Sequence, residues 1–219
     1  MKYIIHACNK RIWYVEGFLI PSMKAQGIPD KEIEINEDTE LLGCLFSTLK
    51  GFQKCSADPG GTWHLQDDVV LSRDFYEKTK QHDDGVVMGF WHRYKNRPDL
   101  HAGKTSVKEM TYSFPCMRVP NDVAGEFVRW FEEEAKWREK YARMIEEKKY
   151  VDVFFRDFMK ERHSDGFVNN LKPSIVDHVD WLIGGSTINK WRLEICRAAY
   201  WEDESIIEEL KEQLAHRKS

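Results

Sequence analysis

Hydrophobic positions in the first part of the chain alternate between two spacings, which predicts strands and helices in turn. A short apolar run at 2–7 predicts a buried strand, and 32–36 and 61–66 show the alternation of further strands. The intervening stretches 12–26 and 41–52 carry apolar side chains at helical spacing. Strands and helices in this order are typical of an α/β sheet that is rich in parallel strands.

The sequence after residue 120 is predicted to be mainly helical, at 121–137, 150–161 and 202–219. Loops are predicted at 96–120, which contains three prolines, and at 169–189 around Pro173 and Gly184-Gly185. We therefore expect two regions that pack as one compact domain. They are an α/β region at 1–120 and a helical region at 121–219.

Polar residues follow the predicted parallel strands at 8–11, 36–39 and 67–68. Ligands of open α/β sheets bind beyond the carboxyl ends of the strands. We therefore expect these three loops to converge in one cleft.

Two adjacent carboxylates, Asp67 and Asp68, lie between the β-forming residues Leu65 and Val69. This position predicts half-buried carboxylates, and their burial costs several kcal/mol unless a cation or hydrogen-bond donors compensate. Hard oxygen ligands suit Mg²⁺ or Mn²⁺ bound together with a substrate phosphate. The alternative is a strand that simply ends in acidic residues.

The composition is that of a globular enzyme-sized chain without a strong charge. The chain has 219 residues, of which 42% are hydrophobic, and its net charge of −4 does not support bulk attachment to nucleic acid or anionic lipid. Five scattered cysteines without CxxC spacing predict reduced thiols and a cytoplasmic protein. The apolar run before His6 is too short for a signal peptide, and no run approaches the roughly 20 residues of a membrane span.

Four stretches of the chain carry a resemblance to a known family. The QDDV stretch at 66–69 resembles the metal-binding carboxylate motif of GT-A-fold nucleotide-sugar glycosyltransferases, and HACNKR at 6–11 resembles the loop that receives their nucleotide. PSIVDH at 173–178 is similar to a Pro-Ser-Leu-Val-x-His element late in several of these families, and 114–119 lies where acceptor-side elements usually occur. The order of the stretches resembles short glycosyltransferase-like proteins of phage and bacteria.

This resemblance implies a GT-A-like Rossmann-type mixed sheet flanked by helices, with a helical C-terminal part. In that family's terms 1–120 would be the nucleotide-sugar-binding region and 121–219 the acceptor-side and C-terminal region. It implies a metal-dependent transferase that moves a sugar from a nucleotide-sugar donor, most simply a UDP-sugar, to a glycan or a modified phage DNA base. Asp68 and His178 would hold Mn²⁺ (or Mg²⁺). The residues that would bind the nucleotide are Ala7, Cys8, Asn9, Lys10, Arg11, Asn36, Asp38, Gln66 and Asp67.

Several of these residues also have simpler interpretations. Lys10 and Arg11 suit phosphate but are equally consistent with solvated charges at the start of a helix. Asn36 and Asp38 suit a ribose or a base, or only form a turn. His178 suits a metal, or is a surface or core histidine.

A transferase that inverts the sugar's configuration also needs a carboxylate to take the acceptor's proton. Asp152 and Asp157 are candidates because aromatic neighbours would desolvate them and raise their pKa. Asp152 is favoured by its neighbours Val151, Val153 and Phe154. The alternative is an exposed helix face, and in a retaining enzyme Asp152 could contact the sugar instead.

Two other functions are compatible with the same residues. One is a metal-dependent nucleotidyltransferase or phosphotransferase, in which the carboxylate pair would bind a triphosphate. The other is a non-catalytic nucleotide-binding or interaction protein. Basic residues between Arg93 and Lys108 could add a local phosphate-binding patch.

Overall fold

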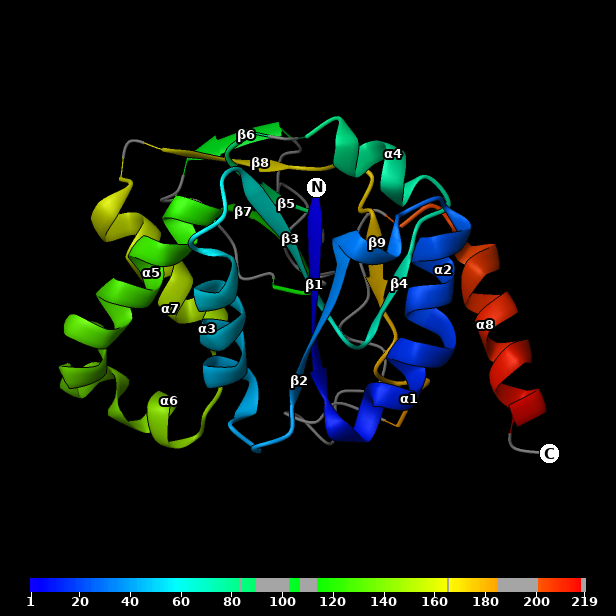
Figure 1. Ribbon diagram of the computed structural model, residues 1–219, viewed down its shortest axis with the longest axis horizontal. Helices are drawn as coiled ribbons and strands as arrows, with labels where there is room; N and C mark the ends of the chain where they lie inside the picture. Colours follow the sequence, from blue (N-terminus) through cyan, green and yellow to red (C-terminus); the bar gives the residue numbers. More distant parts are fainter. Residues whose placement is uncertain (83, 90–102, 107–113, 165, 185–200, 218–219) are drawn as a thin grey trace, which may run out of the picture.

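A seven-stranded mixed sheet organises the chain (Figure 1). The computed structural model describes residues 1–82, 84–89, 103–106, 114–164, 166–184 and 201–217. Across the sheet the strands are β2 (Ile33–Asp38), β1 (Lys2–Cys8), β3 (Gly61–Gln66), β7 (Cys116–Pro120), β5 (Val86–Met88), β8 (Phe167–Asn170) and β6 (Gly103–Ser106). Because β7 and β6 run antiparallel to their neighbours while the others are parallel, the sheet is mixed, as expected.

The loops predicted at 96–120 and 169–189 are wrong in part, because both contain strands. β7 lies inside the sheet between β3 and β5, so 116–119 of the stretch 114–119 is part of the sheet interior. β8 and a further strand, β9 (Val176–His178), occupy the second stretch. The first four residues of β7 and all three of β9 are buried, so neither strand shows the alternation of a half-exposed strand.

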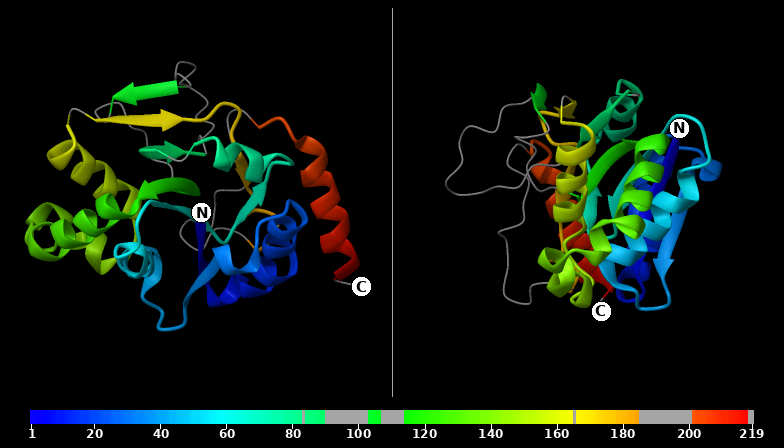
Figure 2. Two further views of the ribbon diagram at one scale, coloured as in Figure 1. Left: turned by 45° about the horizontal axis from the view of Figure 1, so that its top comes forward. Right: turned by 90° about the vertical axis from the view of Figure 1, so that its left-hand side faces the viewer.

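Helices cover both faces of the sheet, and Figure 2 shows this grouping from two further directions. The α-helices are α1 (Ile12–Tyr14), α2 (Ile20–Ala25), α3 (Gly43–Cys55), α4 (Phe75–Lys80), α5 (Asn121–Glu133), α6 (Ala142–Glu146), α7 (Val151–Arg162) and α8 (Glu204–Arg217). A π-helical turn, Val15–Leu19, joins α1 to α2, and 3₁₀ turns occur at Asn9–Arg11, Asp30–Glu32, Ala135–Trp137 and Glu139–Tyr141. Among the described residues, no helix is long and apolar enough to cross a membrane.

The core is split between the two faces, and β1 shows how the sequence specifies this. Tyr3 and Ile5 pack with residues of the π-helical turn and α8, whereas Ile4 packs with residues of α3, α5 and α7. Successive side chains of a strand point to opposite faces, so the apolar run of β1 serves two cores at once. Strands from both regions expected in the sequence share the sheet, since β8 pairs with β5.

A two-stranded ribbon connects the late part of the chain to the acidic pair. β4 (Val69–Leu71) pairs antiparallel with β9, with Val69 opposite His178 and Leu71 opposite Val176. The Val179 N–H donates to the Asp68 carbonyl oxygen at 2.8 Å. This pairing brings the PSIVDH stretch beside Asp67-Asp68.

Candidate functional site

A cleft opens where β1, β2 and β3 end, at the lower edge of the sheet in Figure 1. Its volume is about 250 Å³. The three strand-end loops meet in this cleft, as the sequence predicted. Its lining residues are His6, Ala7, Cys8, Arg11, Asp38, Gly43, Cys44, Ser47, Thr48, Gln66, Asp67, Asp68, Glu147, Lys148 and Lys149.

Arg11 neutralises the acidic pair from the loop after β1. Its Nη1 donates to Asp67 Oδ1 at 2.9 Å and also to Asp68 Oδ2. The Cys8 N–H donates to the other oxygen of Asp67, Oδ2, at 2.6 Å. Arg11 is 5% exposed and each aspartate 6%, so these charges are buried rather than solvated. The sequence predicted the buried carboxylates but did not pair them with Arg11.

The two carboxylates are electrostatically different. Burial and the neighbouring charge of Asp68 raise the pKa of Asp67, against the opposing effect of Arg11. Burial would also raise the pKa of Asp68, but His178 and Arg11 outweigh it and lower that pKa below its usual range. Asp68 is therefore the carboxylate that stays ionised most readily.

His178 lies between two aspartates at the far side of this pair. Its Nε2 is 3.0 Å from Asp68 Oδ1, and its Nδ1 is 3.4 Å from Asp180 Oδ1. All three residues are buried, and they offer ligand atoms within 4.8 Å of one another. The pairing of β9 with β4 creates this group from segments more than a hundred residues apart.

The group of Asp68, His178 and Asp180 fits a divalent metal. Two carboxylates and an imidazole form a donor set suited to Mn²⁺. Within the described part of the chain, Asp180 Oδ2 is buried without a hydrogen-bond partner, so it is an uncompensated acceptor. Asp68 turns Oδ1 toward this group and Oδ2 toward Arg11, which allows it to serve both. Asp180 was not predicted from the sequence, because 169–189 was expected to be a loop; the spacing of two residues between His178 and Asp180 was a usable signal.

The expected nucleotide-binding residues divide into those that line the cleft and those that do not. Ala7, Cys8, Arg11, Asp38, Gln66 and Asp67 line it. Asn9 and Lys10 are exposed on the 3₁₀ turn and are not among the lining residues. Asn36 is 2% exposed and donates to the Ser47 carbonyl oxygen at 2.7 Å, so its amide is used inside the protein. Burial raises the pKa of Cys8 to about 11.

Asp38 has a structural task at the start of α3. Its Oδ1 accepts the Leu42 N–H at 2.7 Å and its Oδ2 accepts the Gly43 N–H at 2.8 Å. These N–H groups would otherwise be unpaired at a helix N-terminus. Asp38 therefore shapes the cleft wall while it also lines the cleft.

The floor of the cleft contains a buried histidine pair. His6 Nε2 is 3.0 Å from His64 Nδ1, and Asn36 Nδ2 is 3.3 Å from His6 Nδ1. Gly51 makes room for this ring, since a Cβ there would lie 2.4 Å from His6 Cε1. Burial lowers the pKa of His6 to about 3 and that of His64 well below its usual value. Both imidazoles are therefore neutral at pH 7.

The histidine pair predicts a loss of stability in acid. An unfolded histidine takes up a proton near pH ~6.5, whereas folded His6 does so only near pH 3. Between these values the unfolded state binds more protons, so the free energy of unfolding should fall as the pH drops from 7 to 4. Urea unfolding at several pH values measures this effect. The free energy of unfolding should fall less steeply with decreasing pH for His6→Asn than for the parent. The variant His216→Asn, at an exposed position of α8, should retain the parent slope. An unchanged slope in His6→Asn would contradict this assignment.

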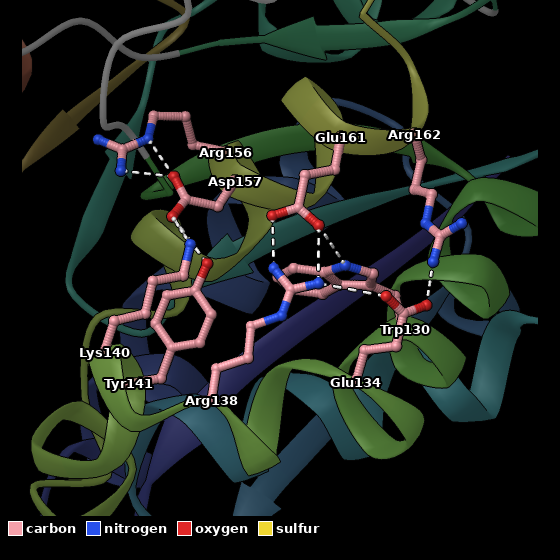
Figure 3. A network of polar contacts seen from close by, with 9 residues as sticks. All are labelled: Trp130, Glu134, Arg138, Lys140, Tyr141, Arg156, Asp157, Glu161 and Arg162. Carbon is pink, nitrogen blue, oxygen red and sulfur yellow. Dashed lines mark hydrogen bonds and ion pairs between the residues drawn. The ribbon is translucent and has the colours of Figure 1, made fainter.

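The expected acceptor-side carboxylates lie on α7 and differ in their surroundings. Asp152, on the first turn, does not line the cleft among the described residues, and burial raises its pKa. Burial raises the pKa of Cys44, and the charge of Asp152 adds to this shift. Asp157 accepts from Tyr141 Oη at 2.7 Å and from Arg156 Nε at 2.9 Å (Figure 3).

The network in Figure 3 ties α5, the following 3₁₀ turns and α7 together. Arg138 donates to both carboxylate oxygens of Glu161 at 2.6 and 3.0 Å, and Trp130 Nε1 donates to the same side chain at 3.1 Å. Burial would raise the pKa of Asp157, but the hydrogen bonds from Tyr141 and Arg156 outweigh it and lower that pKa. A lowered pKa is the opposite of the raised pKa that was expected from the sequence for Asp157 as a base.

Two sequence features fall outside or partly outside the described residues. Most of the basic stretch 93–108 lies outside them, as does Cys196. The cysteines that are described, Cys8, Cys44, Cys55 and Cys116, are free thiols.

Comparison with solved structures identifies the fold. No protein-family model matches the sequence, and no curated protein sequence does either. An active-site mutant of LgtC is similar over 99% of this chain and 96% of its own, with a TM-score of 0.51 and 14% identity. TarS from S. aureus is similar over 84% of this chain and 62% of its own, with a TM-score of 0.51 and 10% identity. The structure of the galactosyltransferase LgtC in complex with donor and acceptor sugar analogs is similar over 95% of this chain and 94% of the LgtC chain, with a TM-score of 0.49 and 11% identity. The chain therefore has a GT-A glycosyltransferase-like fold.

Proposed function

We propose that this protein is a metal-dependent glycosyltransferase that transfers a sugar from a nucleoside diphosphate donor to an acceptor hydroxyl. The observation that carries the proposal is the group of Asp68, His178 and Asp180 beside a cleft at the carboxyl ends of parallel strands. The GT-A glycosyltransferase-like fold supports it, because ligands of α/β sheets bind beyond the carboxyl ends of the strands, where a divalent metal would stabilise the charge of a departing diphosphate.

The metal would be Mn²⁺, or Mg²⁺, held by Asp68, His178 and Asp180. When bound, it supplies a Lewis acid that stabilises negative charge on the departing diphosphate. Arg11 keeps both carboxylates of the QDD turn in place, since it donates to each of them. The Cys8 N–H bond to Asp67 couples the loop after β1 to the same turn. In this proposal the donor is a UDP-sugar and the acceptor is a glycan or a DNA base.

Of the two carboxylates on α7, Asp152 is the better base for an inverting transfer. Burial raises its pKa, which is the direction of shift that a general base requires. Asp157 is less suited, because Tyr141 and Arg156 hold it in its ionised form. Asp157 therefore has a structural role in the proposed function. Asp152 is the proposed base, and because it does not line the cleft among the described residues, the acceptor would have to reach the first turn of α7.

Calorimetry with UDP, GDP and CDP, each with and without Mn²⁺, tests the proposal. We expect Mn²⁺-dependent binding of at least one of these diphosphates, because Asp68 lines the cleft and also belongs to the group with His178 and Asp180. A marked preference for triphosphates over diphosphates would favour a nucleotidyltransferase instead. Absence of nucleotide binding under all conditions would favour a non-catalytic interaction protein and would refute the proposal.

A further inference from the structure

The wall of the cleft opposite the sheet comes from the helical half of the chain. Glu147, Lys148 and Lys149, which follow α6, line the cleft together with Gly43, Cys44, Ser47 and Thr48 of α3. The two segments are about a hundred residues apart in sequence. From the sequence we expected 121–219 to serve the acceptor, so this contact with the nucleotide cleft is an additional role.

The contact between these segments is tight. The Leu45 N–H donates to the Lys148 carbonyl oxygen at 3.1 Å, and Lys148 Nζ donates to the Leu41 carbonyl oxygen at 3.3 Å. Gly43 is needed for this approach, because a Cβ there would lie 2.7 Å from Lys148 Cβ and 2.9 Å from its carbonyl oxygen. The wall is therefore a built feature of the fold.

Unusual backbone conformations gather at this rim. In the described residues, the non-glycine residues with positive φ are Leu41 at 55°, Lys148 at 54° and Tyr150 at 65°. All three lie in the two segments that meet here, and Gly43 has φ of 80°. Left-handed conformations are sterically unfavourable for these residue types and tend to occur at ligand sites. Leu41 and Tyr150 also expose 75% and 40% of their surface, unlike most large apolar side chains of this protein.

The wall lies at the end of the cleft away from the acidic pair. Asp67-Asp68 follow β3, whereas Asp38 and α3 follow β2, and β1 separates these strands. Two strand spacings place the ends of the cleft about 10 Å apart. The Asp38 carboxylate and the Lys148 carbonyl already accept N–H groups at the start of α3, so this helix end is poorly suited to a phosphate. A diphosphate at Asp68 would thus extend its nucleoside toward Glu147–Lys149.

We propose that Glu147–Lys149 recognises the nucleoside part of the donor, which makes the segment between α6 and α7 a determinant of nucleotide specificity. This inference rests on the proposed function. The lysine ammonium groups are donors for base and ribose oxygens, and the Glu147 carboxylate is an acceptor for ribose hydroxyls. Lys149 Nζ is 3.9 Å from Glu147 Oε2, which keeps both side chains at the rim. Ser47 and Thr48 of the same wall carry hydroxyl groups and also line the cleft.

The double variant Lys148→Ala/Lys149→Ala tests this inference, because it retains the Cβ of Lys148 and the backbone bond to Leu45. Calorimetry with Mn²⁺ should compare the best nucleoside diphosphate among UDP, GDP and CDP with inorganic pyrophosphate. We expect nucleoside diphosphate binding to weaken by roughly tenfold, while pyrophosphate binding stays at the parent value. The matched control is Lys160→Ala, which replaces an exposed lysine on α7. It should leave the affinities for nucleoside diphosphate and for pyrophosphate unchanged.

The outcomes separate this inference from the proposed function. If the parent binds neither nucleotide nor pyrophosphate, the proposed function fails. If the parent binds nucleotide and the double variant binds it equally well, or loses pyrophosphate affinity to the same extent, the inference alone is overturned. Should the double variant have a lowered melting temperature, Cys44→Trp fills the same end of the cleft from α3. It should exclude nucleoside diphosphate and retain pyrophosphate, and nucleotide binding at parent affinity would overturn the inference.

Discussion

Replacing Asp68 with alanine is expected to abolish Mn²⁺-dependent binding of nucleoside diphosphate, with a loss of about 100-fold or more in affinity. Asp68 Oδ1 is 3.0 Å from His178 Nε2, and Asp68 is the only member of the carboxylate pair that belongs to the Asp68, His178 and Asp180 group. His178 and Arg11 lower its pKa, so it is ionised and ready to bind a cation at neutral pH. Its removal takes away a carboxylate that no neighbour can replace.

The measurement is the shift in melting temperature on addition of Mn²⁺ and nucleotide, supported by calorimetry. The parent should show the shift and Asp68→Ala should not. Asp68→Asn preserves the shape of the side chain and should also lose the shift, because the amide lacks the charge. Asp30→Ala removes an acidic side chain that is 75% exposed and should behave as the parent. An undiminished shift in Asp68→Ala would remove Asp68 from the metal site.

Replacing Arg11 with methionine is expected to lower the free energy of unfolding by about 3–5 kcal/mol. Arg11 donates to both Asp67 and Asp68 through one guanidinium nitrogen, and all three side chains are buried. Without it, adjacent carboxylates of like charge would remain in a low-dielectric environment. Methionine fills much of the same volume, so the loss reflects charge compensation more than packing.

Urea unfolding at pH 7 measures this effect. Lys10→Met, at the exposed neighbouring position, should change the free energy of unfolding by less than about 0.5 kcal/mol. The double variant Arg11→Met/Asp67→Asn should recover part of the loss, because it removes one of the two uncompensated charges. If Arg11→Met alone is as stable as the parent, the carboxylates do not depend on Arg11 for compensation.

The Arg11 variant also tests the proposed metal site. If Asp68 binds Mn²⁺, added metal should offset part of the instability of Arg11→Met, because a ligand that binds only the folded state stabilises it. The same addition should have no such effect on Asp68→Ala. This comparison separates a metal site from a carboxylate pair that needs only its arginine.

The sequence alone determined the order of strands and helices around the cleft. The apolar run of β1, the alternation of β3 and the helical spacing of α3 are local patterns, and neighbouring residues are sufficient to establish them. Because parallel strands end at the same edge of a sheet, the convergence of Cys8, Asp38 and Asp67-Asp68 followed from chain order alone. The acidic pair could be recognised because charges between β-forming residues are costly to bury.

Only the tertiary structure decided which residues meet those carboxylates. Arg11 was one of two neighbouring basic residues in the sequence, and the turn after β1 buries Arg11 while Lys10 stays exposed. Asp180 joined the group through the pairing of β9 with β4, and Asn36 became a buried bridge between His6 and the Ser47 carbonyl oxygen. Lys148 reached the cleft through its contact with α3. The reason is physical: strand pairing and side-chain burial depend on contacts between segments far apart in sequence, and local periodicity carries no information about their partners.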